Sequence, residues 1–185
     1  MISARARDSF DLLLAQALSE NLVAARGGRC QVEPLAGKGD LREAEFVILT
    51  ISSYLFRAMV LFHFNDNAAT RAHFARLVNT SPEAMDRKAF EDAVAEFGNL
   101  CCGALNRELG RHFPHVGMST PNLLEGSCIL HLGALQAGYL RHYQVEVEGD
   151  TRFHATLCVC DYGDLDFRAE RQRVVEAAVG ELELF

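Results

Sequence analysis

The chain of 185 residues contains 49% apolar and 23% charged residues and has a formal net charge of −7. These values are ordinary for a globular protein, and the length suits a single domain, 1–185, with a sizeable core. Neutralising phosphates requires clustered Lys and Arg, so the acidic balance and the lack of any basic run argue against a nucleic-acid partner.

The first predicted helix covers 8–26 and is amphipathic. Polar residues such as Asp11 and Gln16 interrupt its apolar positions, so we expect neither a signal peptide nor a membrane span. Gly27 and Gly28 are typical of a helix end. Because no export signal is expected, we interpret the six cysteines as reduced thiols in a cytoplasmic protein. These cysteines are Cys30, Cys101, Cys102, Cys128, Cys158 and Cys160.

The middle of the chain alternates between turn signals and runs of β-forming residues. A loop is expected over 33–43, where proline and glycines recur. β-Branched and aromatic residues then favour two strands, at 44–52 and 56–64. A short helix is expected over 68–78, after the capping residues of an Asn-Asp-Asn run. A long helix follows over 86–113.

The last third of the chain is predicted to be mainly β. After a loop, three strands are expected, at 125–133, 140–148 and 152–161. The last two form a hairpin that turns at Gly149-Asp150. Helical spacing over 168–179 predicts a final helix. The sequence therefore predicts an α+β sandwich, in which a mainly antiparallel sheet has long helices packed on one side.

The long helix at 86–113 has two distinct faces. Its apolar residues recur with helical spacing and lie on one side: Phe90, Ala93, Val94, Phe97, Cys101, Ala104, Leu105 and Leu109. The opposite side is polar and has little bulk: Asp92, Glu96, Asn99, Gly103, Asn106 and Gly110. Asp, Asn and Gly are poor residues for a helix interior, so we infer that something other than helix propensity selected this face.

Glu96 and Asn99 lie one helical turn apart on this polar face, where such residues are close neighbours. Neither side chain is a nucleophile, and an amide has no useful pKa for general-base catalysis. An amide can, however, hold a water molecule by donating and accepting hydrogen bonds at once. In phosphoryl transfer, where positioning and electrostatics carry the reaction, that role is sufficient. Glu96 could pair with a lysine or arginine of a partner.

The setting of this pair is more specific than the spacing alone. The helix reads Glu96-Phe-Gly-Asn99-Leu-Cys-Cys-Gly103, and the loop after it reads Ser119-Thr-Pro121 before a segment that contains Gly126. This order resembles the CheX branch of the CheC/CheX/FliY chemotaxis phosphatase family. The resemblance is clearest from Phe90 to about Ile129 and extends more loosely over most of the chain.

The resemblance implies a CheC/CheX-like fold and an enzyme that removes the aspartyl phosphate of a CheY-type response regulator. Asn99 would orient the attacking water, and Glu96 would pair with the regulator's active-site lysine. Asp92, Gly103 and Asn106 would contact the partner, with Gly103 keeping the helix surface low. The Mg²⁺ would be the regulator's own, so this chain would need no metal ligands and no cofactor. The resemblance also implies one site and a homodimer formed through sheet edges.

Four alternatives remain open from the residues themselves. The polar face could be a solvated helix surface, or it could pack within the fold of a purely structural dimer. Gly103 could allow close packing against another helix of the same chain. The face could also bind a receiver domain or a motor component without catalysis, since Gly98 places a helix-weakening residue inside the motif, at a cost of about 1 kcal/mol.

The remaining cysteines and histidines give no motif. Cys101 and Cys102 are predicted on the core side of the helix, and Cys158 and Cys160 on one face of a strand, as small hydrophobic residues. No Cys-x-x-Cys pattern favours a redox or metal role. A zinc site using the histidines near the end of the long helix has no support in their spacing.

Overall fold

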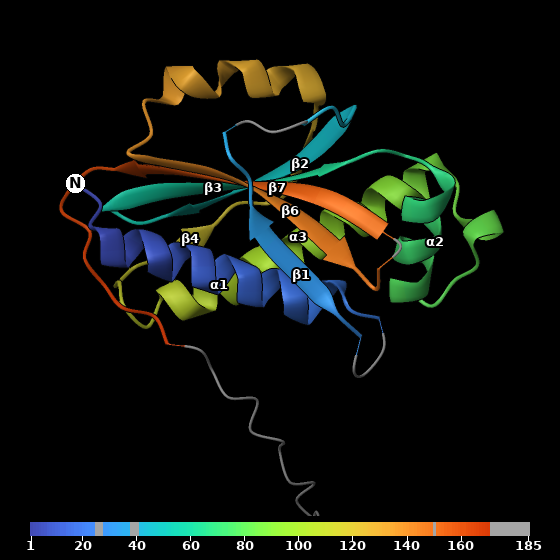
Figure 1. Cartoon of the computed structure of the whole chain (residues 1–185), viewed down its shortest axis with the longest axis horizontal. Coiled ribbons are helices and arrows are strands. Elements are labelled where there is room, and N and C mark those ends of the chain that lie inside the picture. Colours follow the sequence, from blue (N-terminus) through green and yellow to red (C-terminus); the bar gives the residue numbers. More distant parts are fainter. Residues whose placement is uncertain (25–27, 38–40, 150, 171–185) are drawn as a thin grey trace, which may run out of the picture.

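The structure is a computed structural model that describes residues 1–24, 28–37, 41–149 and 151–170. It is built around an antiparallel sheet (Figure 1). The strand order is β1-β6-β7-β3-β2-β4, and β5 also pairs with β2. The strands are β1 (Cys30–Pro34), β2 (Glu45–Ser52), β3 (Phe56–Phe64), β4 (Gly117–Met118), β5 (Asn122–Glu125), β6 (Tyr139–Val147) and β7 (Thr151–Asp161). The predicted α+β class and antiparallel sheet are confirmed.

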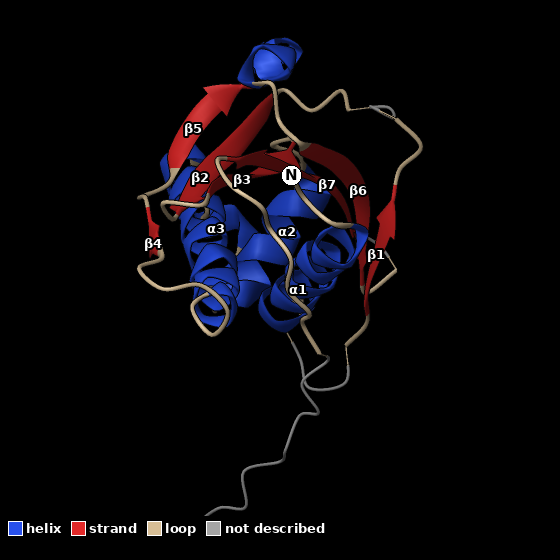
Figure 2. Cartoon of the chain, turned by 90° about the vertical axis from the view of Figure 1, so that its left-hand side faces the viewer, coloured by secondary structure: helices blue, strands red, loops and turns tan. Residues whose placement is uncertain are grey.

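In the described part of the chain, three α-helices cover one face of this sheet, as predicted (Figure 2). They are α1 (Ala4–Leu22), α2 (Ala68–Leu77) and α3 (Arg87–Leu109), and a single 3₁₀ turn, η1 (Pro82–Ala84), precedes α3. The main core lies between these helices and the sheet, because alternate residues of each strand point toward them. On β3, for example, Phe56, Val60 and Phe64 face the helices.

The opposite face of the sheet is covered by a 3₁₀ helix, η2 (Gly126–Leu135), which is the gold helix above the sheet in Figure 1. The strand predicted at 125–133 is therefore wrong. β5 ends at Glu125 because its partner β2 begins there, at Glu45, and leaves nothing further to pair with. Gly126 then packs directly on the backbone of Glu43 and Ala44, where a side chain would not fit.

η2 buries a second, smaller hydrophobic cluster against the outer face of the sheet. Ile129 and Leu132 lie three residues apart, which is the repeat of a 3₁₀ helix, so both point toward the strands. The buried members of this cluster are Phe46, Met59, Leu61, Ile129, Leu132 and Cys158. The apolar content that suggested a strand at 125–133 is thus used to cover the sheet.

The helix predicted over 8–26 is α1, Ala4–Leu22, which begins and ends four residues earlier, so its end is not at the predicted glycine pair. The loop predicted over 33–43 overlaps the end of the edge strand β1, which forms by pairing with the distant strand β6. Of the helix predicted over 168–179, residues 168–170 adopt no helix, and the rest lies outside the described residues. In the described part of the chain, no helix is both long enough and apolar enough to cross a membrane.

Candidate functional site

α3 begins where its sequence predicts, at a capped N-terminus. The side chain of Asp86 accepts a hydrogen bond from the backbone N–H of Ala89 at 2.8 Å, which satisfies one of the free donors of the first turn. The apolar face predicted for this helix is buried against the sheet and against α1. The helix is therefore held in one orientation, and its polar face is directed away from the core.

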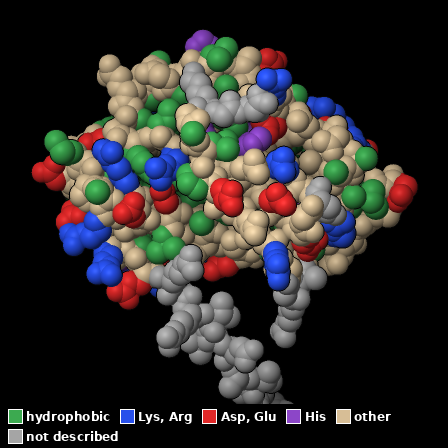
Figure 3. Space-filling model, in the orientation of Figure 1, with side chains coloured by type: hydrophobic (Ala, Val, Ile, Leu, Met, Phe, Trp, Pro, Cys, Tyr) green, Lys and Arg blue, Asp and Glu red, His purple; other side chains and the backbone are tan. Residues whose placement is uncertain are grey.

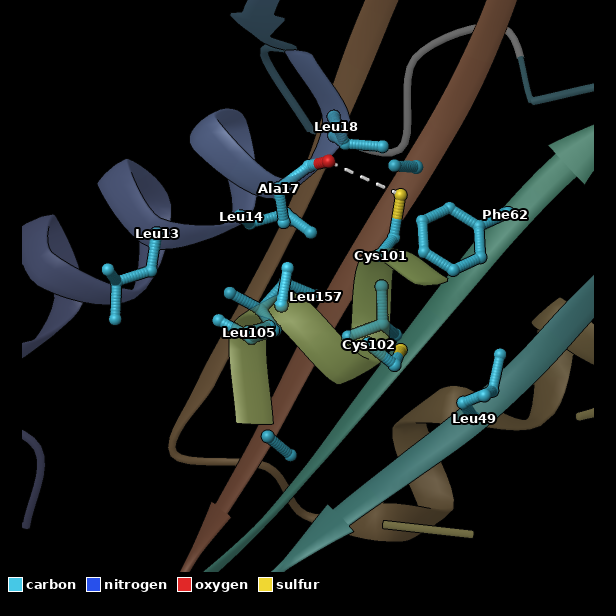
Figure 4. Packing of buried hydrophobic residues seen from close by; sticks show 14 of the residues in the cluster. Leu13, Leu14, Ala17, Leu18, Leu49, Phe62, Cys101, Cys102, Leu105 and Leu157 are labelled. Carbon is cyan, nitrogen blue, oxygen red and sulfur yellow. Dashed lines mark hydrogen bonds between the residues drawn. The ribbon is translucent and has the colours of Figure 1, made fainter. Parts of the chain in front are cut away.

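The two neighbouring cysteines of α3 lie on its buried side, as predicted. The thiol of Cys101 donates to the backbone carbonyl of Ala17 in α1 at 3.4 Å, so it links the two long helices (Figure 4). Cys102 packs among the apolar residues on the same side of α3. Burial raises the pKa of the Cys102 thiol to about 12. Both cysteines therefore act as small core residues rather than as reactive thiols.

Gly98 also belongs to the buried side of α3. A Cβ at this position would lie 2.9 Å from Cδ1 of Leu49 and 3.3 Å from atoms of Phe62 and Val47. The glycine therefore lets α3 approach strands β2 and β3 more closely than any other residue would. This contact explains why a helix-weakening residue lies inside the Glu-x-x-Asn motif.

Glu96 and Asn99 lie on the outer side of α3, one turn apart. Glu96 is exposed and Asn99 is half-buried. Within the described residues, neither side chain forms an ion pair or a side-chain hydrogen bond. Glu96 therefore does not pack within the fold, and the carboxylate and the amide are both available to a partner.

Gly103 lies one turn beyond Asn99, and a Cβ there would meet no atom within 4 Å. Gly103 therefore has no role in packing α3 against another helix of the chain, in contrast to Gly98. Among the residues that the structure describes, its effect is to keep the outer surface of the helix low.

The other two residues predicted to contact a partner are placed differently. Asp92 is exposed, and its carboxylate accepts a hydrogen bond from Lys88 at 2.6 Å in an ion pair one turn back along the helix. Asn106 is half-buried, and its Oδ1 is shielded from solvent without a hydrogen-bond donor among the described residues. Asp92 is therefore more accessible than Asn106.

The Ser-Thr-Pro loop lies along β2, beside α3. The backbone N–H of Ser119 donates to the carbonyl of Thr50 at 2.9 Å, and the N–H of Thr50 donates to the Ser119 hydroxyl at 3.0 Å. β4 and β5, on either side of this loop, both contact α3. The loop and the Glu-x-x-Asn helix, which are adjacent in sequence, are thus fixed to the same edge of the sheet.

Among the described residues, no group of three or more His, Cys, Asp or Glu is placed to hold a metal ion. His112, near the end of α3, contacts the ring of Phe167 with the ring centroids 5.1 Å apart. On the face of the molecule seen in Figure 3, basic and acidic side chains are interspersed rather than gathered by sign.

Two features of the structure were not predicted from sequence. Leu100, next to Asn99, has 51% of its surface exposed on α3. On the outer face of the sheet, the buried histidines His63 and His142 share the hydroxyl of Thr156, and His154 pairs with Glu43. Period-two spacing on β3, β6 and β7 would have placed these polar residues on one face, but their pairing depends on strand register.

A scan of protein-family models and a search of curated proteins find no match for this chain. A search of solved structures does find relatives. The chemotaxis protein CheX from Vibrio vulnificus has 14% sequence identity and a TM-score of 0.57, covering 82% of this chain and 97% of that chain. A CheX–CheY–BeF₃–Mg²⁺ complex from Borrelia burgdorferi gives 12% identity and a TM-score of 0.61, covering 83% and 97%.

FliY from Thermotoga maritima is also similar, with 12% identity and a TM-score of 0.51, covering 84% of this chain and 87% of that chain. These structures confirm the fold that the sequence resemblance implies. The chain has the fold of the CheC/CheX/FliY family.

Proposed function

We propose that this chain is a CheX-like phosphatase that hydrolyses the aspartyl phosphate of a CheY-type response regulator. The observation that carries the proposal is the exposed Glu96, one turn from Asn99 on a helix surface that Gly103 leaves open. A CheX–CheY complex among the similar structures supports a receiver domain as the partner.

The proposed mechanism divides the work between the two side chains. The amide of Asn99 holds a water molecule by donating and accepting, and aims it for in-line attack on the phosphorus. The carboxylate of Glu96 pairs with the active-site lysine of the regulator and fixes the two proteins in register. A Mg²⁺ held by the regulator would neutralise the charge on the phosphoryl oxygens. The products are inorganic phosphate and the free aspartate of the regulator.

The test is phosphate release from a phosphorylated receiver domain mixed with this protein. Asn99→Ala is expected to bind the receiver as well as the wild type and to reduce the maximal rate about a hundredfold, by analogy with the loss of one preorganised donor. Glu96→Ala is expected to lower the rate by weakening the alignment of the two proteins. Glu33→Ala, which alters an exposed carboxylate on β1 at the opposite sheet edge, is the matched control.

If Asn99→Ala and Glu96→Ala both hydrolyse the phosphate at the wild-type rate, the catalytic assignment is wrong. The half-burial of Asn99 favours a second candidate, a module that binds a receiver domain or a motor component without catalysis. Stable association that leaves the phosphate lifetime unchanged would select this second candidate.

We further propose that the chain forms a homodimer through a sheet edge. β5 is an edge strand whose four residues are all exposed, including Leu123 and Leu124. Apolar side chains on an open edge favour pairing with another strand. Sedimentation of the double variant Leu123→Lys/Leu124→Lys is expected to show a monomer, whereas Leu140→Lys, at an exposed leucine of β6, leaves the dimer intact. A double variant that still sediments as a dimer would refute this interface.

A further inference from the structure

The polar face of α3 contains one large apolar side chain, Leu100. Of the exposed large apolar residues in the described part of the chain, Leu100 is the only one on α3. It lies four residues after Glu96 and three before Gly103, so it is a direct neighbour of both on the helix surface. Isolated exposed leucines are common on protein surfaces, but this one lies within the proposed docking face.

The same line of residues continues to Arg107, four residues after Gly103. The spacings of four, three and four keep Glu96, Leu100, Gly103 and Arg107 on one stripe along the helix. At 1.5 Å per residue, this stripe is about 16 Å long. It therefore presents an acid, an apolar side chain, a flat position and a base, in that order.

Arg107 lies on the side of the stripe that faces α1. It is exposed and forms no ion pair with another described residue. It also lines a small cavity of about 80 Å³ between α1 and α3, together with Gln16, Glu20 and Arg111. Its neighbour Arg111 already pairs with Glu108 at 2.9 Å. Arg107 is thus an exposed cation at this end of the helix, with no ion pair among the described residues, and a partner's carboxylate can reach it.

Any partner that places a phosphoryl group against Asn99 and a lysine against Glu96 must also cover Leu100. The leucine is the next residue after Asn99 and lies one turn from Glu96, on the side toward α1. An apolar group of the receiver that packs on this half-exposed leucine removes apolar surface from water. The receiver therefore gains affinity by presenting such a group here. The stripe has an acid at one end and a base at the other. These opposite charges would favour one of the two orientations in which a receiver can lie along the helix.

Resting on the proposed function, we propose that Leu100 and Arg107 determine the affinity and orientation of the receiver domain on α3. The receiver presents an apolar side chain to Leu100, next to the lysine that pairs with Glu96, and a carboxylate to Arg107. Leu100 and Arg107 are positioning residues, because neither reaches the reacting atoms. They act on the concentration of receiver that half-saturates the enzyme and leave the maximal rate unchanged.

The experiment measures single-turnover dephosphorylation over a range of receiver concentrations. Leu100→Ala is expected to raise the half-saturating concentration about tenfold with the maximal rate unchanged, and Leu100→Asp to raise it further. Leu100→Met is expected to restore near wild-type affinity. Leu130→Ala is the matched control, since Leu130 is 69% exposed but lies on η2, on the opposite face of the sheet.

Arg107→Glu is also expected to raise the half-saturating concentration of receiver. The increase should be larger at low salt than at high salt, because ions screen a charge pair. Arg107→Lys is expected to retain most of the affinity. Asn99→Ala should give the reverse pattern, a low maximal rate at unchanged half-saturation.

The outcomes separate this proposal from the proposed function. Suppose that Leu100→Asp and Arg107→Glu both have the wild-type half-saturating concentration, while Asn99→Ala has a lower maximal rate. The phosphatase assignment then stands, and the proposed contacts are refuted. If the wild type binds the receiver without hydrolysing its phosphate, the same variants are compared by dissociation constant, and unchanged binding refutes the contacts. A receiver that is neither bound nor dephosphorylated overturns both proposals.

Discussion

Gly98 and Gly103 are five residues apart in α3 and have opposite environments. Gly98 faces the sheet, where Leu49, Phe62 and Val47 leave no room for a side chain. Gly103 faces open space. Each glycine weakens the helix by about 1 kcal/mol relative to alanine. The fold requires a glycine only at Gly98. We propose that the glycine at 103 serves a contact with a partner outside the chain.

The same substitution at the two glycines should therefore have opposite effects on stability. Gly98→Leu is expected to lower the free energy of unfolding by about 2 kcal/mol or more, because the side chain would overpack the interface with β2 and β3. Gly103→Leu is expected to raise it by about 0.5–1 kcal/mol through better helix propensity, while blocking dephosphorylation of the receiver. Urea unfolding and the single-turnover assay measure the two effects.

Each variant serves as the control for the other, since both place a leucine in the same helix. A Gly103→Leu variant as unstable as Gly98→Leu would show that Gly103 is required for packing after all. A stable Gly103→Leu variant with full activity would show that the surface at Gly103 does not approach a partner.

The roles of these two glycines could be predicted only in part from the sequence. Helical periodicity correctly places Gly103 on the polar face with Glu96 and Asn99. The same periodicity gives no reason for Gly98, because the residue that it contacts most closely, Leu49, belongs to a strand far away in the sequence. The exposure of Leu100 could not be predicted for a related reason. Helical periodicity does not show whether the neighbouring helix α1 covers this side chain.

At the scale of elements, local signals predicted most of the fold. The strands β2, β3, β6 and β7 and the helices α2 and α3 lie close to their predicted positions, because their residues combine clear periodicity with caps and turns. The errors occur where a distant partner decides the structure. β1 exists because it can pair with β6, and the apolar segment after β5 becomes η2 because β2 offers no further backbone to pair with.

The candidate site depends on the elements that were predicted well. α3 carries both proposed catalytic side chains, and the loop at Ser119 is hydrogen-bonded to β2 at Thr50. The exposure of Glu96, by contrast, could not be predicted from spacing alone, since a polar face can also pack within a fold. It follows from the packing of α3, whose buried face contacts α1 and β2 and leaves Glu96 on the outer side.

At the scale of the whole molecule, the sheet separates two different environments. The helix side holds the main apolar core and directs α3 outward. The outer side holds the small cluster under η2 and, beside it, a group of buried histidines. His63 is 3% exposed, and its Nε2 lies 2.9 Å from the hydroxyl of Thr156. His142 contacts the same hydroxyl at 2.8 Å through Nδ1.

Burial lowers the pKa of His63 to about 4, because a charged imidazole would be poorly solvated there. The nearby carboxylate of Glu43 opposes this shift, and the histidines His142 and His154 reinforce it. An unfolded histidine has a pKa of about 6.5. As the pH falls below 6.5, the unfolded chain therefore binds a proton at this residue that the folded chain does not bind until about pH 4.

This difference predicts that the protein loses stability on acidification, between about pH 6.5 and pH 4. The contribution of His63 to the free energy of unfolding is complete above pH 6.5 and declines by about 3 kcal/mol toward pH 4. His63→Gln removes the titrating group, so its unfolding free energy should depend less steeply on pH across this window than that of the wild type. His131→Gln, at an exposed histidine of η2, should leave the wild-type slope unchanged. Urea denaturation at a series of pH values gives the slopes, and equal slopes for wild type and His63→Gln would mean that His63 is readily protonated in the folded protein.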